Sequence, residues 1–446
     1  MKKTLILLFC GLLIGAAVAW ALITFVIPNW HRSAVDNTFL QVTSKLDQGG
    51  EAFAYFHAEK VSGAFKDVIS GLQKNVSALP EARQVQAKQG LDMVNLMFKS
   101  YGLEEISGLG FSSFAVKPGL HRVRVVIHHR VGQNKGLIWN IAGPAPRFLD
   151  EIELLPADTA LAFVADYNIA KLIEWLGQLG QKMGSQDPQS QGMEQGIAMM
   201  KAGLQSAGID ADRLLKSYGG RLGFLLTLDP EKRVTLPLAA KPLSIPEPAF
   251  ALLLRVNDAY LFDTLKTKLT ASGHNKATEV KGLKKIVFPR LPGPFPMEPV
   301  IAQKGEWLLL ASRDSLVENV FNGPDPRLAG SEAFREMAYK LPRRGNGFGY
   351  ASPLLPRLVA QALRENMAAF PVPAALEKIT AFIEKSKGFC QVWENSDQGL
   401  IYTINHGFEI SSLPGLIEAF MDIAREKKLM QKDAVSPPPL GEAPVN

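Results

Sequence analysis

Few residues of this chain have the types and spacing that catalysis or metal binding needs. Three of its histidines are close in the sequence, at His121, His128 and His129. On a regular strand, His128 and His129 point to opposite faces, and His121 lies roughly 20 Å or more from either. The histidines therefore predict no metal site, and we expect His128 and Arg130 on a solvated or partner-facing strand surface.

Nucleophiles and phosphate loops also lack the required context. The sequence has no Gly-x-Ser-x-Gly elbow. Cys390 lies in a predicted strand and is expected to be a small buried hydrophobe. The glycine-rich stretch Gly219–Gly223 precedes a predicted strand and opens no helix, so it offers no helix N-terminus to a phosphate.

Carboxylates occur in groups near predicted helix starts and turns, where they favour the helix dipole or cap backbone amides. The groups are Glu104-Glu105, Asp150-Glu151-Glu153 and Asp210-Asp212. Capping is the role that we expect for each. The sequence thus predicts no catalytic residue, no cofactor and no metal.

One proline-rich stretch, Phe288–Pro299, is the most unusual surface candidate. Five prolines stiffen it, and apolar side chains would be costly to expose there without purpose. We expect a partner-docking loop, a lip over an apolar cavity, a tip that touches a membrane, or a long hairpin loop packed on its own domain. The candidate partner or ligand residues are Phe288, Arg290, Leu291, Phe295 and Met297.

The N-terminus has the pattern of a membrane span. Residues Leu5–Ile27 carry no charge, and the stretch is long enough to cross about 30 Å of hydrocarbon as a helix. Trp30 and Arg32 are expected at the membrane interface, and the basic start (Lys2, Lys3) should stay in the cytoplasm. These features predict a single-pass inner-membrane protein that contacts the membrane through residues 5–27, with its bulk on the periplasmic or extracytoplasmic side. The alternative is a signal peptide cleaved after Ala19.

Composition limits the function further. The chain has 446 residues, 47% of them hydrophobic, and two cysteines. One of these is Cys10 in the predicted span, so no intramolecular disulfide can form in the globular part. The net charge of +6 comes without basic runs interleaved with aromatics, so we expect no nucleic-acid partner.

A pattern of a short strand, two helices and a strand pair occurs three times. The expected first strands are Gly49–Phe56, Ala157–Val164 and Gly345–Tyr350. The expected strand pairs are Gly110–Val116 with Arg122–Arg130, Arg221–Leu228 with Ala249–Val256, and Gly388–Glu394 with Gly399–Asn405. The fold class is therefore predicted as α+β, with antiparallel sheets, helices packed on one face, repeated strand-helix-helix-strand-strand modules and an N-terminal transmembrane helix.

Six regions follow from this pattern. They are a membrane anchor or signal segment (1–32), a first module (33–150), a second module (151–256), a helix-strand-strand-strand-helix segment (257–330), a third module with a C-terminal amphipathic helix (331–430) and a disordered tail (431–446). Residues 184–196 and 236–248 are polar or proline-rich, and they are predicted to be loops or disorder.

The stretch Leu155-Pro156-Ala157-Asp158-Thr159 precedes an aliphatic strand and a helix. With Glu306–Ser312, it resembles an uncharacterised family of exported bacterial proteins that is defined as a domain of unknown function. The resemblance covers residues 150–420. It implies an exported location and a fold class, and it implies no active site.

Three functions remain open. The first is a non-enzymatic, membrane-tethered component of the cell envelope that binds or scaffolds another component. The second is a carrier or sensor of a lipid or other apolar ligand, which would require an apolar sheet face left uncovered by helices. The third is an envelope hydrolase whose site combines distant carboxylates.

Overall fold

The computed structural model describes residues 37–425, except for 77–79, 144, 184–187, 238–241, 272–274, 294–296, 366, 368–372, 409–414, 420 and 423–424. The predicted span, Trp30, Arg32, Phe295 and the tail 431–446 lie outside these residues. Within the described part, no helix is long and apolar enough to cross a membrane.

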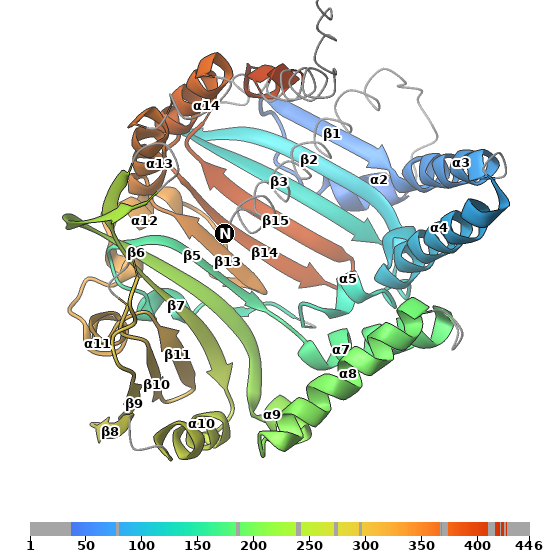
Figure 1. Cartoon of the computed structure of the whole chain (residues 1–446). Coiled ribbons are helices and arrows are strands. Elements are labelled where there is room, and N and C mark those ends of the chain that lie inside the picture. The colour runs from blue at the N-terminus through green and yellow to red at the C-terminus, as the bar shows by residue number, and fades with distance from the viewer. Residues whose placement is uncertain are drawn as a thin grey trace, which may run out of the picture.

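The fold is mixed α/β and is built on one large antiparallel sheet, as the sequence predicted in outline. The sheet has 13 strands in the order β1-β2-β3-β15-β14-β13-β5-β6-β7-β11-β10-β9-β8 (Figure 1). Two short strands, β4 (Arg147–Phe148) and β12 (Arg344–Gly345), pair separately.

Three segments of the chain share one order of elements: a strand, two long helices and two strands. The first is β1 (Ala52–His57), α3 (Ala58–Val76), α4 (Glu81–Tyr101), β2 (Ile106–Lys117) and β3 (Leu120–His129). The second is β5 (Thr159–Asp166), α7 (Ile169–Met183), α8 (Pro188–Ser206), β6 (Tyr218–Leu236) and β7 (Leu243–Val256), with a short helix α9 (Ala211–Ser217) before β6. The third is β13 (Gly347–Ala351), α13 (Leu354–Glu365), α14 (Pro373–Lys385), β14 (Phe389–Ser396) and β15 (Gly399–His406).

The three strands of each segment are neighbours in chain order, and antiparallel contacts join one segment to the next. β15 pairs with β3, and β13 pairs with β5. The third segment therefore lies between the first and the second, so three strands from the C-terminal part of the described chain form the middle of the sheet.

A further set of elements extends the sheet beyond β7. Its members are α10 (Tyr260–Thr270), β8 (Lys276–Val280), β9 (Leu283–Val287), β10 (Val300–Lys304), β11 (Trp307–Ala311) and α11 (Asp314–Asn322). The predicted helices and the strands β9, β10 and β11 are present, and β8 was missed. Because β11 pairs with β7, these strands continue the same sheet.

Short helices complete the described chain. They are α2 (Asn37–Thr43), η2 (Leu103–Glu105), α5 (Leu137–Asn140), α6 (Glu151–Leu154), η3 (Leu328–Gly330) and α12 (Glu332–Met337). The main hydrophobic core lies between one face of the sheet, which we call the core face, and side chains from α6, α11, η3 and α12. At the β1 side of the sheet, Val42 and Leu46 pack on Val126 of the same face.

Two predicted loops are wrong. Most of residues 184–196 belongs to α8, which begins at Pro188, a residue that suits the first turn of a helix because its missing N–H needs no partner there. Residues 236–248 fall largely in the hairpin of β6 and β7, where Leu236 pairs with Leu243. The polar composition of the first stretch and the prolines of the second concealed these elements.

The three helix pairs α3–α4, α7–α8 and α13–α14 stand along the margin of the sheet, while the strands from β1 to β7 turn a broad face toward the viewer in Figure 1. We call this the open face. It is the opposite side of the sheet from the core face.

Candidate functional site

The proline-rich loop forms the tip of the β9–β10 hairpin. The Leu291 amide donates to the Met297 carbonyl at 2.8 Å, and Phe288 packs against a small core that α10 shares. Arg290 is exposed and Leu291 is 47% exposed. Of the candidate residues, Phe288 is thus structural, and Leu291 and Arg290 remain at the surface.

The predicted solvated surface is wrong for His128, whereas Arg130 is exposed as expected. His128 and His129 are both buried, and the Ser107 hydroxyl lies 2.7 Å from Nδ1 of His128. The reason is that neighbours distant in the sequence bury this strand, and the local sequence pattern cannot show such neighbours. Among the described residues, no group of histidine, cysteine and carboxylate side chains could hold a metal ion.

Cys390 is buried, as expected, and burial raises the pKa of its thiol well above the ordinary value. The capping role is confirmed for Asp210, whose Oδ1 accepts from the backbone amides of Asp212 and Arg213. Both residues therefore have structural roles, because the Cys390 thiol stays protonated in the core and Asp210 caps a helix.

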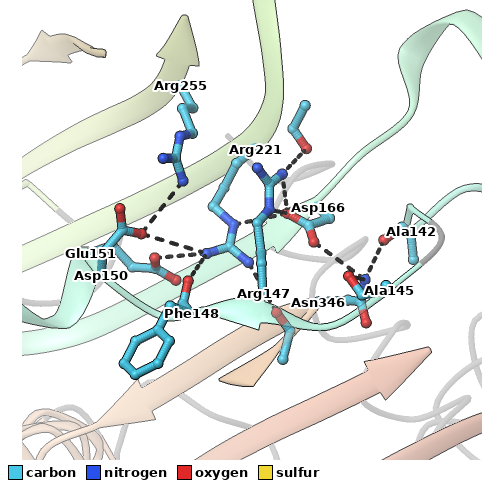
Figure 2. A network of polar contacts seen from close by, with 12 residues as sticks. Ala142, Ala145, Arg147, Phe148, Asp150, Glu151, Asp166, Arg221, Arg255 and Asn346 are labelled. Carbon is cyan, nitrogen blue, oxygen red and sulfur yellow. Dashed lines mark hydrogen bonds and ion pairs between the residues drawn. The ribbon is translucent and has the colours of Figure 1, made fainter. Parts of the chain in front are cut away.

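Capping is the wrong role for Glu151. This residue is fully buried, and its Oε2 accepts from Nη1 of Arg221 at 2.8 Å (Figure 2). Arg221 is itself fully buried, and its Nε donates to Oδ1 of Asp166 at 2.8 Å. It also donates to the carbonyls of Phe148 and Gly345, so one guanidinium joins five segments of the chain.

The network continues from Asp166. Arg147 donates to the same Oδ1 at 2.8 Å, and the Asn346 side chain donates to Oδ2 and to two backbone carbonyls, those of Ala142 and Ala145 (Figure 2). The contacts of Arg147, Ala142 and Ala145 link the strands to the irregular segment before β5. The arrangement therefore fastens that segment to the core face.

Burial raises the pKa of Glu151 to about 7, and the positive charge of Arg221 opposes this rise. A raised carboxyl pKa is often a sign of a catalytic acid. Here both side chains are fully buried, so a substrate has no route to the carboxyl. We assign the network a structural role.

The open face is largely apolar, which is unusual for a sheet surface that faces water. Residues directly opposite on paired strands share a face, so one row can be followed across ten strands. It runs Ala54, Phe111, Val125, Tyr402, Trp393, Gly347, Ala165, Leu222, Leu254 and Leu308. No member of this row is charged.

A second row lies beside the first. It runs Ser113, Val123, Ile404, Gln391, Gly349, Phe163, Phe224, Leu252 and Leu310. Phe163 is 40% exposed, Leu252 44% and Leu310 38%. The core-face residues between them, such as Ala162 and Leu253, are completely buried. These strands are thus apolar on both sides, and the open side is partly exposed at Phe163, Leu252 and Leu310, whereas α10 covers it at Leu308, which is completely buried.

Two glycines of β13 shape the middle of the open face. A Cβ on Gly347 would overlap the indole of Trp393, and one on Gly349 would lie 2.9 Å from the ring of Phe163. The glycines let large rings from β14 and β5 lie flat over β13. Trp393 in turn stacks on Tyr402 at 6.0 Å.

Two buried histidines lie at one end of this face. His121 and His406 are opposite each other on β3 and β15, with ring centroids 5.9 Å apart. Nδ1 of His121 is 2.9 Å from Oε1 of Glu51, and the His406 ring stacks on Phe408 at 3.9 Å. Burial and the nearby His121 lower the pKa of His406 to about 4.

This shift predicts acid sensitivity. The folded-state pKa of His406 is lower than its unfolded value, so the unfolded chain binds a proton that the folded chain does not, and stability falls as the pH drops from about 6.5 to about 4. His406→Phe, which keeps the ring stack, should reduce this loss by about 2–3 kcal/mol. Urea unfolding of both proteins at pH 7.5 and 4.5 measures it, and equal losses would contradict the assignment.

No protein-family model matches the sequence, and neither a curated protein nor a solved structure matches it.

Proposed function

We propose that this protein binds a lipid or another apolar ligand on the open face of its sheet, as a carrier or sensor. The observation that carries the proposal is the pair of uncharged rows across the sheet, in which Leu222 of the first row and Phe163, Leu252 and Leu310 of the second are each more than a third exposed. An antiparallel sheet with one wet face normally alternates apolar and polar residues. An apolar surface of this extent, left in water, marks a binding site.

The dimensions favour a ligand with several chains. Ten strands spaced by about 4.8 Å give a face roughly 40 Å wide. This width exceeds the thickness of the hydrocarbon layer of a whole bilayer, which is about 30 Å. One acyl chain would cover a small part of that face. A diacyl or larger lipid fits its extent better.

The location remains part of the same proposal. An anchor at residues 5–27 would hold the protein at the inner membrane with its bulk on the periplasmic side, where lipids are available. The three strand-helix-helix-strand-strand segments have the same order and pairing, which supports repetition of one module as the origin of so wide a sheet.

The scaffold function is second to the ligand-binding function, because a flat partner surface would be expected to carry polar groups as well. The hydrolase is third. Its strongest candidate, Glu151, is enclosed with Arg221 and has no solvent contact.

Photo-crosslinking tests the proposal. Cells are fed a photoreactive fatty acid that enters their phospholipids, membranes are irradiated, and the labelled peptides of the full-length protein are identified by mass spectrometry. We expect label on the open-face residues of β5, β6 and β7, above all at Phe163 and Leu252. Label confined to residues 1–36 would show contact of the N-terminal segment alone and would overturn the proposal.

A further inference from the structure

Aromatic side chains that carry a polar atom gather at one margin of the open face. Tyr402 and Trp393 are opposite each other on β15 and β14 in the first row, and their rings stack. Tyr167 directly follows β5, two residues after a member of the same row. Tyr101 ends α4, and Trp175 lies on α7, which are two of the helices along this margin (Figure 1). We call these five side chains the aromatic rim.

Contacts bring the members of the aromatic rim together. The rings of Tyr101 and Trp175 meet edge to face at 6.4 Å, and Nε1 of Trp175 donates to the carbonyl of Ser100 at 3.0 Å. Tyr101 is also close to the other two tyrosines. Burial and then the nearby Tyr101 raise the pKa of Tyr402, and burial and then the nearby Tyr167 raise the pKa of Tyr101. Side chains from two helices and from the sheet thus meet at one place.

The rim presents hydroxyl groups next to an apolar surface. Tyr101 is 38% exposed and Tyr167 42%, and Tyr402 is partly buried. In the described part of the chain, none of these three hydroxyls has a hydrogen-bond partner. Tyrosine and tryptophan favour places where one end of the ring meets hydrocarbon and the other meets water, as at the headgroup level of a membrane. The rim therefore marks the boundary between hydrocarbon and water on the open face.

We propose that the aromatic rim binds the headgroup of the lipid, and that this headgroup is an uncharged sugar, as in a glycolipid. The proposal rests on the ligand-binding function proposed above. Each sugar hydroxyl can donate to and accept from a tyrosine hydroxyl, while the C–H groups of the sugar pack against the aromatic rings.

The charges near the rim argue against an anionic headgroup. The five rim side chains are uncharged. Lys171, one turn before Trp175 on α7, is paired with Glu174 at 2.8 Å, and Arg147 is bound to Asp166. A phosphate at the rim would lose water without gaining a cation from these side chains, and this loss is costly.

The distance between the rim and the exposed apolar side chains fits one lipid. Phe163 lies four residues before Tyr167, which is about 13 Å along an extended chain. One leaflet of a bilayer has about 15 Å of hydrocarbon, half of the whole layer. A lipid whose chains cover Phe163 therefore places its headgroup at the rim.

Lipid competition tests the proposal with the full-length protein in detergent. The protein is mixed with equal amounts of glucosyl-diacylglycerol and phosphatidylglycerol that have the same acyl chains, and bound lipid is counted by native mass spectrometry. Phe163→Asp with Leu252→Asp gives the background, because lipid held by the N-terminal segment alone is still counted in it. Above this background, we expect the glucosyl lipid to exceed phosphatidylglycerol by about fivefold or more.

A hydroxyl-deletion variant identifies the rim as the source of the preference. Tyr101→Phe with Tyr167→Phe and Tyr402→Phe keeps all three rings, so it should hold as much lipid in total while the preference for the sugar falls to about one. Tyr339→Phe, which removes a hydroxyl at a 39% exposed site after α12, should keep the preference.

The outcomes separate the headgroup assignment from the proposed function. Equal binding of the two lipids, a preference for phosphatidylglycerol, or a full sugar preference in the triple variant would overturn the assignment and leave lipid binding on the open face intact. Binding of neither lipid above the background would overturn both.

Discussion

Arg221→Met is expected to lower the free energy of unfolding by about 3–5 kcal/mol, the largest stability effect of any single substitution that we predict. Methionine fills much of the space that arginine occupies, so the loss would come from charge and not from a cavity. Among the described residues, Glu151 would lose its only cationic partner in a site without solvent, while Asp166 would keep Arg147.

The size of this loss should depend on pH. Without Arg221, burial of Glu151 and the nearby Asp150 are no longer opposed by a positive charge, so the folded-state pKa of Glu151 rises further above the unfolded value of about 4.5. The folded variant then binds a proton that the unfolded chain releases, and stability falls as the pH rises through that window. Pulse proteolysis in urea of the wild type and the variant at pH 5.5 and 8 should show the larger difference at pH 8.

Arg221→Met with Glu151→Gln is the matched control. Because the uncompensated carboxylate is removed, the double variant should recover part of the lost stability and lose the added pH dependence. A single Arg221→Met variant as stable as the wild type at both pH values would show that the network does not fasten the segment before β5.

Local order was predictable along much of the chain. Alternation and helical spacing predicted first strands, helices and strand pairs in three segments, because those signals act over a few residues. The pairing of β15 with β3 and of β13 with β5 was not predictable, since it joins residues more than 180 positions apart, as for Ala165 and Gly347. The consequence is that the three segments form one large sheet, where the sequence predicted several.

The charged network was missed for a related reason. Arg221 meets Glu151 and Asp166 from 70 and 55 residues away. One local signal was present: Arg221 falls in phase with Gly223 and Leu225, the face that alternation predicts to be buried. A charged residue in that phase requires a buried partner.

The open face could not be recognised in the sequence either. A strand such as Leu222–Leu228 is apolar at nearly every position, and this pattern normally indicates a strand covered on both sides. Burial instead alternates along it, with Leu225 fully buried and Leu222 38% exposed. A strand covered on both faces and one covered on a single face are distinguished here only by the position of the helix pairs, which lie along the margin of the sheet.

This exposed row leads to the second large prediction. Phe163→Asp with Leu252→Asp should reduce lipid labelling of the open face at least tenfold, which equals about 1.4 kcal/mol of binding free energy. Each carboxylate would have to lose water when a hydrocarbon chain covers it, and that cost opposes binding. Because both side chains are already about two-fifths exposed, the fold should tolerate the change.

The controls separate charge from loss of bulk and from general effects. Phe163→Leu with Leu252→Met keeps the face apolar and should keep most of the labelling, whereas Val131→Asp adds a carboxylate at a 76% exposed site in the turn after β3 and should change nothing. Labelling is read as the ratio of open-face peptides to peptides from residues 1–36 in the same sample, which corrects for the amount of protein in the membrane. An unchanged ratio in the double aspartate variant, with normal resistance to proteolysis, would mean that the open face does not contact lipid, because a charged face of intact fold cannot hold hydrocarbon as well as an apolar one.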